Sequence, residues 1–114
     1  MQPEKIVPKP WGEEVWICVN EHYALKKITL NKGERTSLQY HDFKVEHSYL
    51  LTGHIHVISK IAGVEHIDEY LPGDVWHFKP NEIHRVVALK TSVFIEVSTP
   101  HLDDVVRVED DYKR

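Results

Sequence analysis

The chain has 114 residues, of which 41% are hydrophobic and 28% are charged, and its formal net charge is −4. This size and composition predict one globular domain, residues 1–114, and the charge argues against a nucleic-acid-binding protein. No apolar run approaches the ~18 residues of a membrane span, and the N-terminus does not have the build of a signal peptide. The lone Cys18 cannot form an intramolecular disulfide, so we expect a buried thiol and a cytoplasmic location.

The predicted elements are short strands separated by turns about every ten residues. Residues rich in Val, Ile, Thr and aromatics predict strands at 13–19, 23–30, 47–51, 54–59, 74–78, 85–89 and 92–98. Turn signals stand at Asn31–Gly33, Thr52–Gly53, Ala62–Gly63, Pro72–Gly73 and Pro80–Asn81. The N-terminal PKPWG segment should run extended, and residues 101–114 fit either a helical turn or an edge strand with a polar tail. This spacing is typical of an all-β barrel or sandwich.

Four potential metal ligands lie within this pattern, at Gln39, His41, Glu46 and His84. Gln39 and His41 are two residues apart, so on a strand both side chains point to the same face. Glu46 would change face, and a bend around residues 42–44 must therefore redirect it. His84 follows a separate turn and would close the site from across the barrel. Two imidazoles, a carboxylate and an amide suit Zn most simply, with Fe, Mn, Co or Ni as alternatives.

The remaining histidines carry less information than these two. For His47, His54, His56, His66 and His101 we expect solvated positions or positions at the barrel rim. His77 lies on a predicted strand just before the His84 segment, and it is a candidate acid/base group facing the cavity.

The spacing of the four ligands resembles the two signature motifs of the cupin superfamily. Residues 33–53 read Gly33-x5-Gln39-x-His41-x4-Glu46-x6-Gly53, against the usual G-x5-H-x-H-x3,4-E-x6-G. The second motif is looser, because Lys79, Asn81 and Ala88 replace its usual Pro, Gly and Asn. Asn is the best substitute for Gly where a turn needs a positive φ. The resemblance implies a single-domain cupin, a small antiparallel β-barrel or jelly roll, that forms a homodimer.

A narrower resemblance is to type II mannose-6-phosphate isomerases, including the C-terminal domain of bifunctional mannose-1-phosphate guanylyltransferase/mannose-6-phosphate isomerases. SLQYHDFKVEH resembles the family's SLQ-x-H-x-x-R-x-E-H, KPWGEE resembles its opening segment, and the pair His84–Arg85 matches its later His-Arg. The ending IEV…LDDVVRVEDDYKR is also similar. The chain departs from the family at Lys44, where an arginine is usual, and Lys does not reproduce a planar bidentate guanidinium.

This resemblance implies a metal-dependent sugar-phosphate aldose–ketose isomerase with one divalent cation. Lys44 and Arg85 adjoin the proposed ligands and are the candidates to hold a phosphate. Two alternatives stay open, because Lys44 departs from the family pattern. One is another metal-dependent cupin reaction, dioxygenation or epimerisation. The other is a carbohydrate-binding module whose metal is structural.

Overall fold

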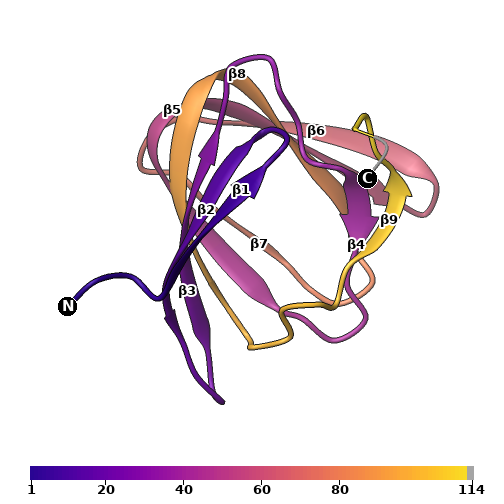
Figure 1. Cartoon of the computed structure of the whole chain (residues 1–114). Helices are drawn as coiled ribbons and strands as arrows, with labels where there is room; N and C mark the ends of the chain where they lie inside the picture. Colours follow the sequence, from indigo (N-terminus) through magenta and orange to yellow (C-terminus); the bar gives the residue numbers. More distant parts are fainter. Residues whose placement is uncertain (113–114) are drawn as a thin grey trace.

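A computed structural model describes residues 1–112, which form a curled antiparallel sheet of nine strands (Figure 1). The strands are β1 (Lys5–Lys9), β2 (Gly12–Val19), β3 (Ala24–Leu30), β4 (Leu38–Tyr40), β5 (Glu46–Ile61), β6 (Val64–Tyr70), β7 (Val75–Phe78), β8 (Ile83–Ser98) and β9 (Val106–Glu109). Within this part of the chain, no helix is long and apolar enough to cross a membrane. The all-β prediction is confirmed.

Two long strands, β5 and β8, form the centre of the sheet. They pair antiparallel along their whole length, from Glu46 opposite Ser98 to Lys60 opposite Ile83. The second half of β8 also pairs with β3, and its first half meets β4, so β8 is shared between both sides of the curl. This sharing bends the sheet around a hollow, which Figure 1 shows as a half-barrel open on one side.

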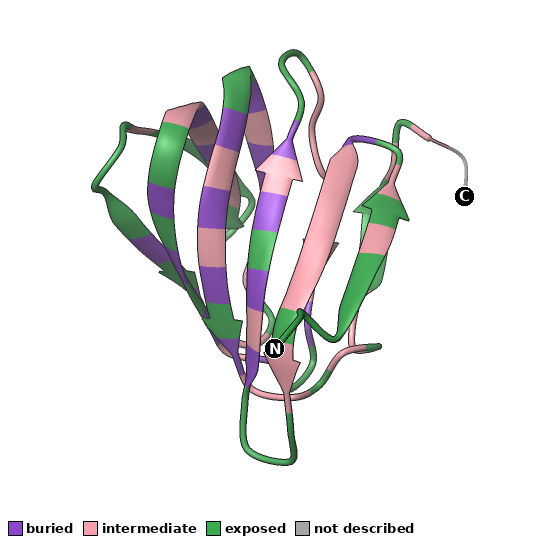
Figure 2. Cartoon of the chain, turned by 60° about the vertical axis from the view of Figure 1, so that its left-hand side comes forward, coloured by how far each residue is buried: buried purple, intermediate pink, exposed green. Residues whose placement is uncertain are grey.

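Alternating burial along the strands separates an inner face from an outer face. β3 alternates between buried and more exposed residues, and Figure 2 shows the same banding on other strands. The inner face carries the hydrophobic core, which consists of Trp11, Ile28, Leu30, Leu50, Ile55, Val57, Trp76, Phe78, Val86, Ala88 and Phe94. Burial of these side chains stabilises the curled sheet, and polar groups occupy the rest of the inner face.

Gly53 corrects one prediction, because Thr52–Gly53 is not a turn. β5 runs straight through it with shifts in its register against β8. The φ of Gly53 is 102°, and a Cβ there would lie 2.2 Å from Ser92 Oγ. Glycine is therefore required for a β-bulge, and this bulge joins two predicted strands into one. The turn at Pro80–Asn81 is confirmed, with Asn81 at the positive φ of 68° that favours Asn.

Both ends of the described chain are edge strands. β1 contains Pro8 and pairs with β2, in keeping with the edge position that proline requires. Of the two alternatives for residues 101–114, the edge strand is the one observed, since β9 pairs with β4. Lys113 and Arg114 lie outside the described residues. Cys18 is a free thiol and is half-buried rather than fully buried.

Candidate metal centre

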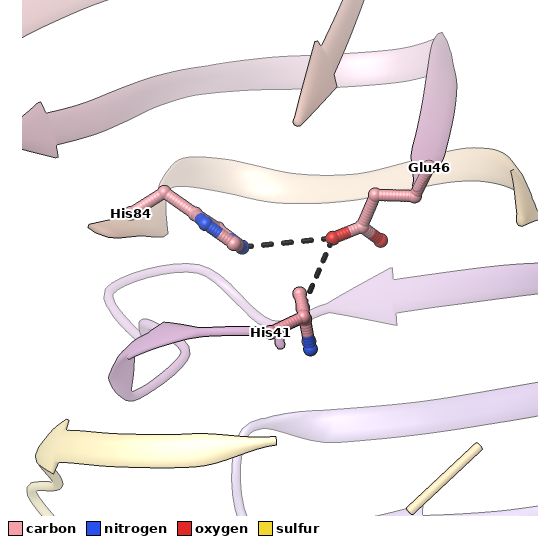
Figure 3. A group of neighbouring side chains, drawn as sticks. All are labelled: His41, Glu46 and His84. Atoms are coloured by element: carbon pink, nitrogen blue, oxygen red, sulfur yellow. Dashed lines mark ion pairs between the residues drawn. The ribbon is translucent and has the colours of Figure 1, made fainter. Parts of the chain in front are cut away.

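Three of the four predicted ligands meet on the inner face of the sheet (Figure 3). His41 follows β4, Glu46 begins β5 and His84 is the second residue of β8. Glu46 Oε1 lies 3.2 Å from His41 Nε2 and 3.6 Å from His84 Nε2. All three side chains are at least 94% buried. A carboxylate and two imidazoles from three distant segments thus converge on one point.

The backbone fixes which ring nitrogen of each histidine faces this point. His41 Nδ1 donates a short hydrogen bond to the carbonyl oxygen of Asp104, and His84 Nδ1 donates to the carbonyl of Glu82 at 2.8 Å. In a neutral imidazole with its proton on Nδ1, each Nε2 would offer a lone pair towards Glu46. Phe78 stacks on the His84 ring, with 3.6 Å between centroids, which further fixes its orientation. Such outer contacts orient metal-ligating histidines in general.

Asp104 also shapes the bend that brings Glu46 into the site. Its carboxylate accepts hydrogen bonds from the backbone N–H groups of Asp42, Phe43 and Lys44 at 3.0, 2.7 and 2.9 Å. A bend at residues 42–43 therefore lies between His41 and Glu46, as the sequence predicts. Without it, the five-residue spacing would put the two side chains on opposite faces of a strand.

Gln39 lies beside the three converging residues. It is in register with His84 across β4 and β8, and it lines the same cavity. Its Oε1 accepts a 2.6 Å hydrogen bond from Ser37 Oγ. Gln39 is therefore a neighbour of the cluster, and its amide has a competing partner.

The geometry of these three side chains fits a divalent metal ion. The buried Nε2 of His41 has no hydrogen-bond partner among the described residues, which is costly unless a cation occupies its lone pair. The donor atoms of the three residues all lie within 4.8 Å of one another. Ligands about 2.0–2.2 Å from a tetrahedral zinc are about 3.3–3.5 Å apart, close to the two distances measured from Glu46.

The charge state of Glu46 suits this role. Burial alone would raise its pKa, but the hydrogen bond from Glu96, the two neighbouring imidazoles and the nearby ammonium of Lys44 hold the pKa well below the ordinary value. Glu46 is therefore a carboxylate, the form that binds a cation.

Beside the cluster, the inner face carries paired buried charges. Lys44 Nζ lies 3.5 Å from Glu46 Oε2 and 3.4 Å from Glu96 Oε2. Burial and the neighbouring Glu46 raise the pKa of Glu96 to about 8. On β2 and β3, Glu14 Oε1 accepts hydrogen bonds from Lys26 Nζ at 3.3 Å and from Trp16 Nε1 at 3.0 Å.

These residues line a cavity of about 190 Å³ that also contains the cluster. It is smaller than the roughly 300–1,000 Å³ of sites for drug-sized ligands, so it suits a small polar molecule. Two further cations, Lys9 and Arg107, line its wall.

The structure places two predicted catalytic residues outside this cavity. His77 is exposed on β7 between the buried Trp76 and Phe78, and it stacks on His47 across the outer face. Arg85 follows His84 and so points away from it, where its Nε donates to the carbonyl of Thr36 at 3.1 Å. Strand alternation gives the physical reason in both cases. Lys44, by contrast, lies in the cavity wall.

Sequence reasoning missed Glu14, Lys26, Glu96 and Asp104. Lys26 lies two residues from the buried Ala24 and Ile28, and Glu96 lies two residues from the buried Phe94 and Ser98. Residues two apart on a strand share a face, so this rule could have identified Lys26 and Glu96 as inward-facing. Asp104 acts across 60 to 62 residues of chain, and no local signal marks it.

Comparison with known proteins gives a family match and several relatives. A sequence model of the family described as "Mannose-6-phosphate isomerase C-terminal" matches residues 1–110. The chain is 32% identical to mannose-1-phosphate guanylyltransferase ManC of Salmonella typhimurium and 31% identical to xanthan biosynthesis protein XanB of Xanthomonas campestris, over 95% of its length in each case. It spans 23% of the length of each of these curated relatives.

Solved structures share the fold at low sequence identity. Oxalate decarboxylase of Bacillus subtilis superposes with a TM-score of 0.78 at 22% identity, over 91% of this chain and 30% of that one. KdgF from a Halomonas species superposes with a TM-score of 0.74 at 17% identity, over 86% and 87% of the two chains. The architecture is the cupin fold, as the sequence predicts.

Proposed function

The chain belongs to the mannose-6-phosphate isomerase C-terminal family, and from this membership we propose that it is a metal-dependent sugar-phosphate aldose–ketose isomerase. We take residues 1–114 as one cupin domain of a cytoplasmic enzyme. The observation that carries the proposal is the meeting of His41, Glu46 and His84 at the wall of a small polar cavity. A module that only bound sugar would not need buried imidazoles with their lone pairs facing one carboxylate.

His41, Glu46 and His84 would hold the cation, with Gln39 as a fourth ligand if its amide turns from Ser37. When bound, a divalent ion such as zinc would act as a Lewis acid that polarises the sugar carbonyl. The residues of the chain would then have to bind the phosphate, exclude water and move one proton between the two carbons.

We assign the proton transfer to Glu14 in place of His77. Aldose–ketose isomerisation needs a base that can reach both carbons, and reach is the first criterion for such a group. Glu14 lines the cavity with 14% of its side chain exposed, whereas Glu96 is packed between Lys44 and Glu46. Since Oε1 of Glu14 accepts the bonds from Trp16 and Lys26, the proton would move to Oε2.

We assign phosphate binding to Lys9 and Arg107 in place of Arg85. Both line the cavity, and Arg107 is partly exposed with its Nε 3.9 Å from Asp110, a distance that leaves the guanidinium able to reorient. A guanidinium can bind a phosphate through two N–H donors at once. Lys44 stays a candidate for a phosphate or hydroxyl contact, although Glu46 and Glu96 already lie 3.5 and 3.4 Å from its ammonium.

The direct test incubates zinc-loaded protein with mannose 6-phosphate and follows fructose 6-phosphate. We expect interconversion, a loss of at least 100-fold in kcat for Glu14→Gln, and a raised KM with a near-normal kcat for Arg107→Ala. Arg85→Ala is the matched control, because its side chain lies outside the cavity. Tight sugar binding without turnover would overturn the isomerase in favour of a binding module, and oxygen uptake by an Fe(II)-loaded sample would favour a dioxygenase.

We also propose a homodimer formed through the outer face of the sheet. Tyr49 on β5 is exposed and lies in register between the exposed Val75 and the half-buried Ile95. Val97, on the same strand as Ile95, extends this apolar surface. Light scattering should report a dimer for the native chain and a monomer for Tyr49→Glu, and a monomeric native chain would refute the proposal.

A further inference from the structure

A second group of metal-ligand side chains lies on the outer face, away from the cavity. His54 and His56 are on β5 on either side of Ile55, which is fully buried, so both histidines project outward. Glu69, on the edge strand β6, is directly in register with His56. The cavity wall includes none of these three residues. This cluster therefore plays no part in the proposed isomerase site.

The three side chains converge on a single point. Glu69 Oε2 lies 3.1 Å from His54 Nε2 and 3.5 Å from His56 Nε2, and the three donor atoms all fall within 4.8 Å of one another. These distances bracket the separation of about 3.3–3.5 Å expected between the ligands of a tetrahedral zinc. The two imidazole rings meet edge to face at 84°, so their nitrogens converge without the rings stacking.

The local environment favours a cation over a simple surface ion pair. His54 Nε2 is buried and makes no hydrogen bond that satisfies the geometry, although it lies near a carboxylate oxygen. Lys90 is in register with His54 on the neighbouring strand, but it is exposed and can extend its ammonium into water.

The bulge at Gly53 fixes the first of these ligands in place. Immediately after it, the backbone N–H of His54 donates a 3.0 Å hydrogen bond to Ser92 Oγ. Ser92 is fully buried, and its hydroxyl also donates to the carbonyl of Lys90 at 2.7 Å. The backbone of His54 is thus held by hydrogen bonds within the sheet before any cation binds.

We propose that His54, His56 and Glu69 form a second divalent-metal site, of the zinc class, on the outer face of the β5–β6 hairpin. Two imidazoles and one carboxylate select a transition metal over calcium or magnesium, which prefer oxygen ligands alone. Three protein ligands leave one tetrahedral position open to water. Because the ligands come from both strands, the cation clamps the edge strand β6 to β5.

The test counts zinc equivalents by calorimetric titration of the metal-free full chain with zinc chloride. We expect two equivalents for the native protein, one for His54→Gln/His56→Gln, and one for His41→Ala/His84→Ala. His66→Gln is the matched control, since His66 lies on β6 outside the cluster, and it should retain two. A surface double variant that still binds two equivalents, or a native chain that binds only the equivalent lost with His41 and His84, would overturn the proposal.

A second measurement tests the clamp without depending on stoichiometry or on isomerase activity. Zinc should slow amide hydrogen exchange along β6 in the native chain and in His66→Gln, but not in Glu69→Gln. Equal slowing in Glu69→Gln would show that zinc acts elsewhere. Failure of the isomerase assay with two zinc equivalents bound would refute the proposed function and leave this site standing.

Discussion

Replacement of Lys44 by methionine should strongly destabilise the metal-free protein. The ammonium lies 3.4 Å from Glu96 and 3.5 Å from Glu46, and all three side chains are at most 9% exposed. Methionine fills a similar volume but leaves the buried Glu46 carboxylate without its cation, beside Glu96, whose pKa is raised to about 8. Removal of one partner from a buried ion pair costs about 3–5 kcal/mol. At about 4 °C per kcal/mol for a domain of this size, the midpoint should fall by about 12–20 °C.

Urea and thermal unfolding after dialysis against a chelator would measure this effect. Lys27→Met is the matched control, because Lys27 is the exposed neighbour of Lys26 on β3, and it should change stability by less than about 0.5 kcal/mol. Addition of zinc should recover part of the loss, since a cation at Glu46 replaces the missing charge. If Lys44→Met and Lys27→Met unfold alike, the buried charge network does not stabilise the fold as argued.

Three further predictions follow from other contacts. Asp104→Ala should weaken zinc binding in the cavity about 10–100-fold, because the carboxylate of Asp104 holds the backbone between two ligands. Gly53→Ala should unfold at markedly lower urea, because its Cβ would clash with the neighbouring strand at a φ of 102°. The pKa of Glu14 is lowered: burial alone would raise it, but Lys26 and a tryptophan hydrogen bond outweigh burial. Its contribution to stability is therefore present above the unfolded-state value near 4.5 and lost as pH falls through the lower folded value, so Glu14→Gln should flatten the acid limb of the stability curve.

Each of these predictions has a control within the chain. Asp103→Ala should leave zinc affinity unchanged. If Asp103→Ala and Asp104→Ala weakened zinc binding equally, the hydrogen bonds of the Asp104 carboxylate would not explain the effect. Gly63→Ala shares a positive φ of 77° but meets open space, so it isolates backbone strain from the clash. Glu13→Gln should keep the acid limb of the native protein's stability curve. If the curve of Glu14→Gln had the same acid limb, the lowered pKa of Glu14 would not contribute to stability.

The strands and the meeting of His41, Glu46 and His84 could be predicted because both depend on spacing in the sequence. Alternation identified most strands, and the separation of His41 from Glu46 required the bend that Asp104 stabilises. The error at Gly53 has a physical cause, since glycine serves both turns and bulges, and only contact with Ser92 decides between them. No pattern within β5 reveals that contact.

The position of His77 and Arg85 outside the cavity has a different physical reason. Both residues are close in sequence to the candidate ligand His84, but strand parity puts their side chains on the face opposite those of their neighbours. Strict use of that parity would have replaced them with Lys26 and Glu96, charged residues on inward-facing positions. The cluster at His54, His56 and Glu69 needed the pairing of β5 with β6, which the sequence does not specify to the residue.

The central claim is that donors far apart in the chain hold one divalent cation inside the sheet. A crystal of zinc-loaded protein, measured at the zinc absorption edge, tests it most directly. We predict an anomalous peak within about 2.0–2.2 Å of His41 Nε2, His84 Nε2 and a Glu46 carboxylate oxygen. A fully occupied zinc peak elsewhere, with these three side chains free of metal, would contradict it.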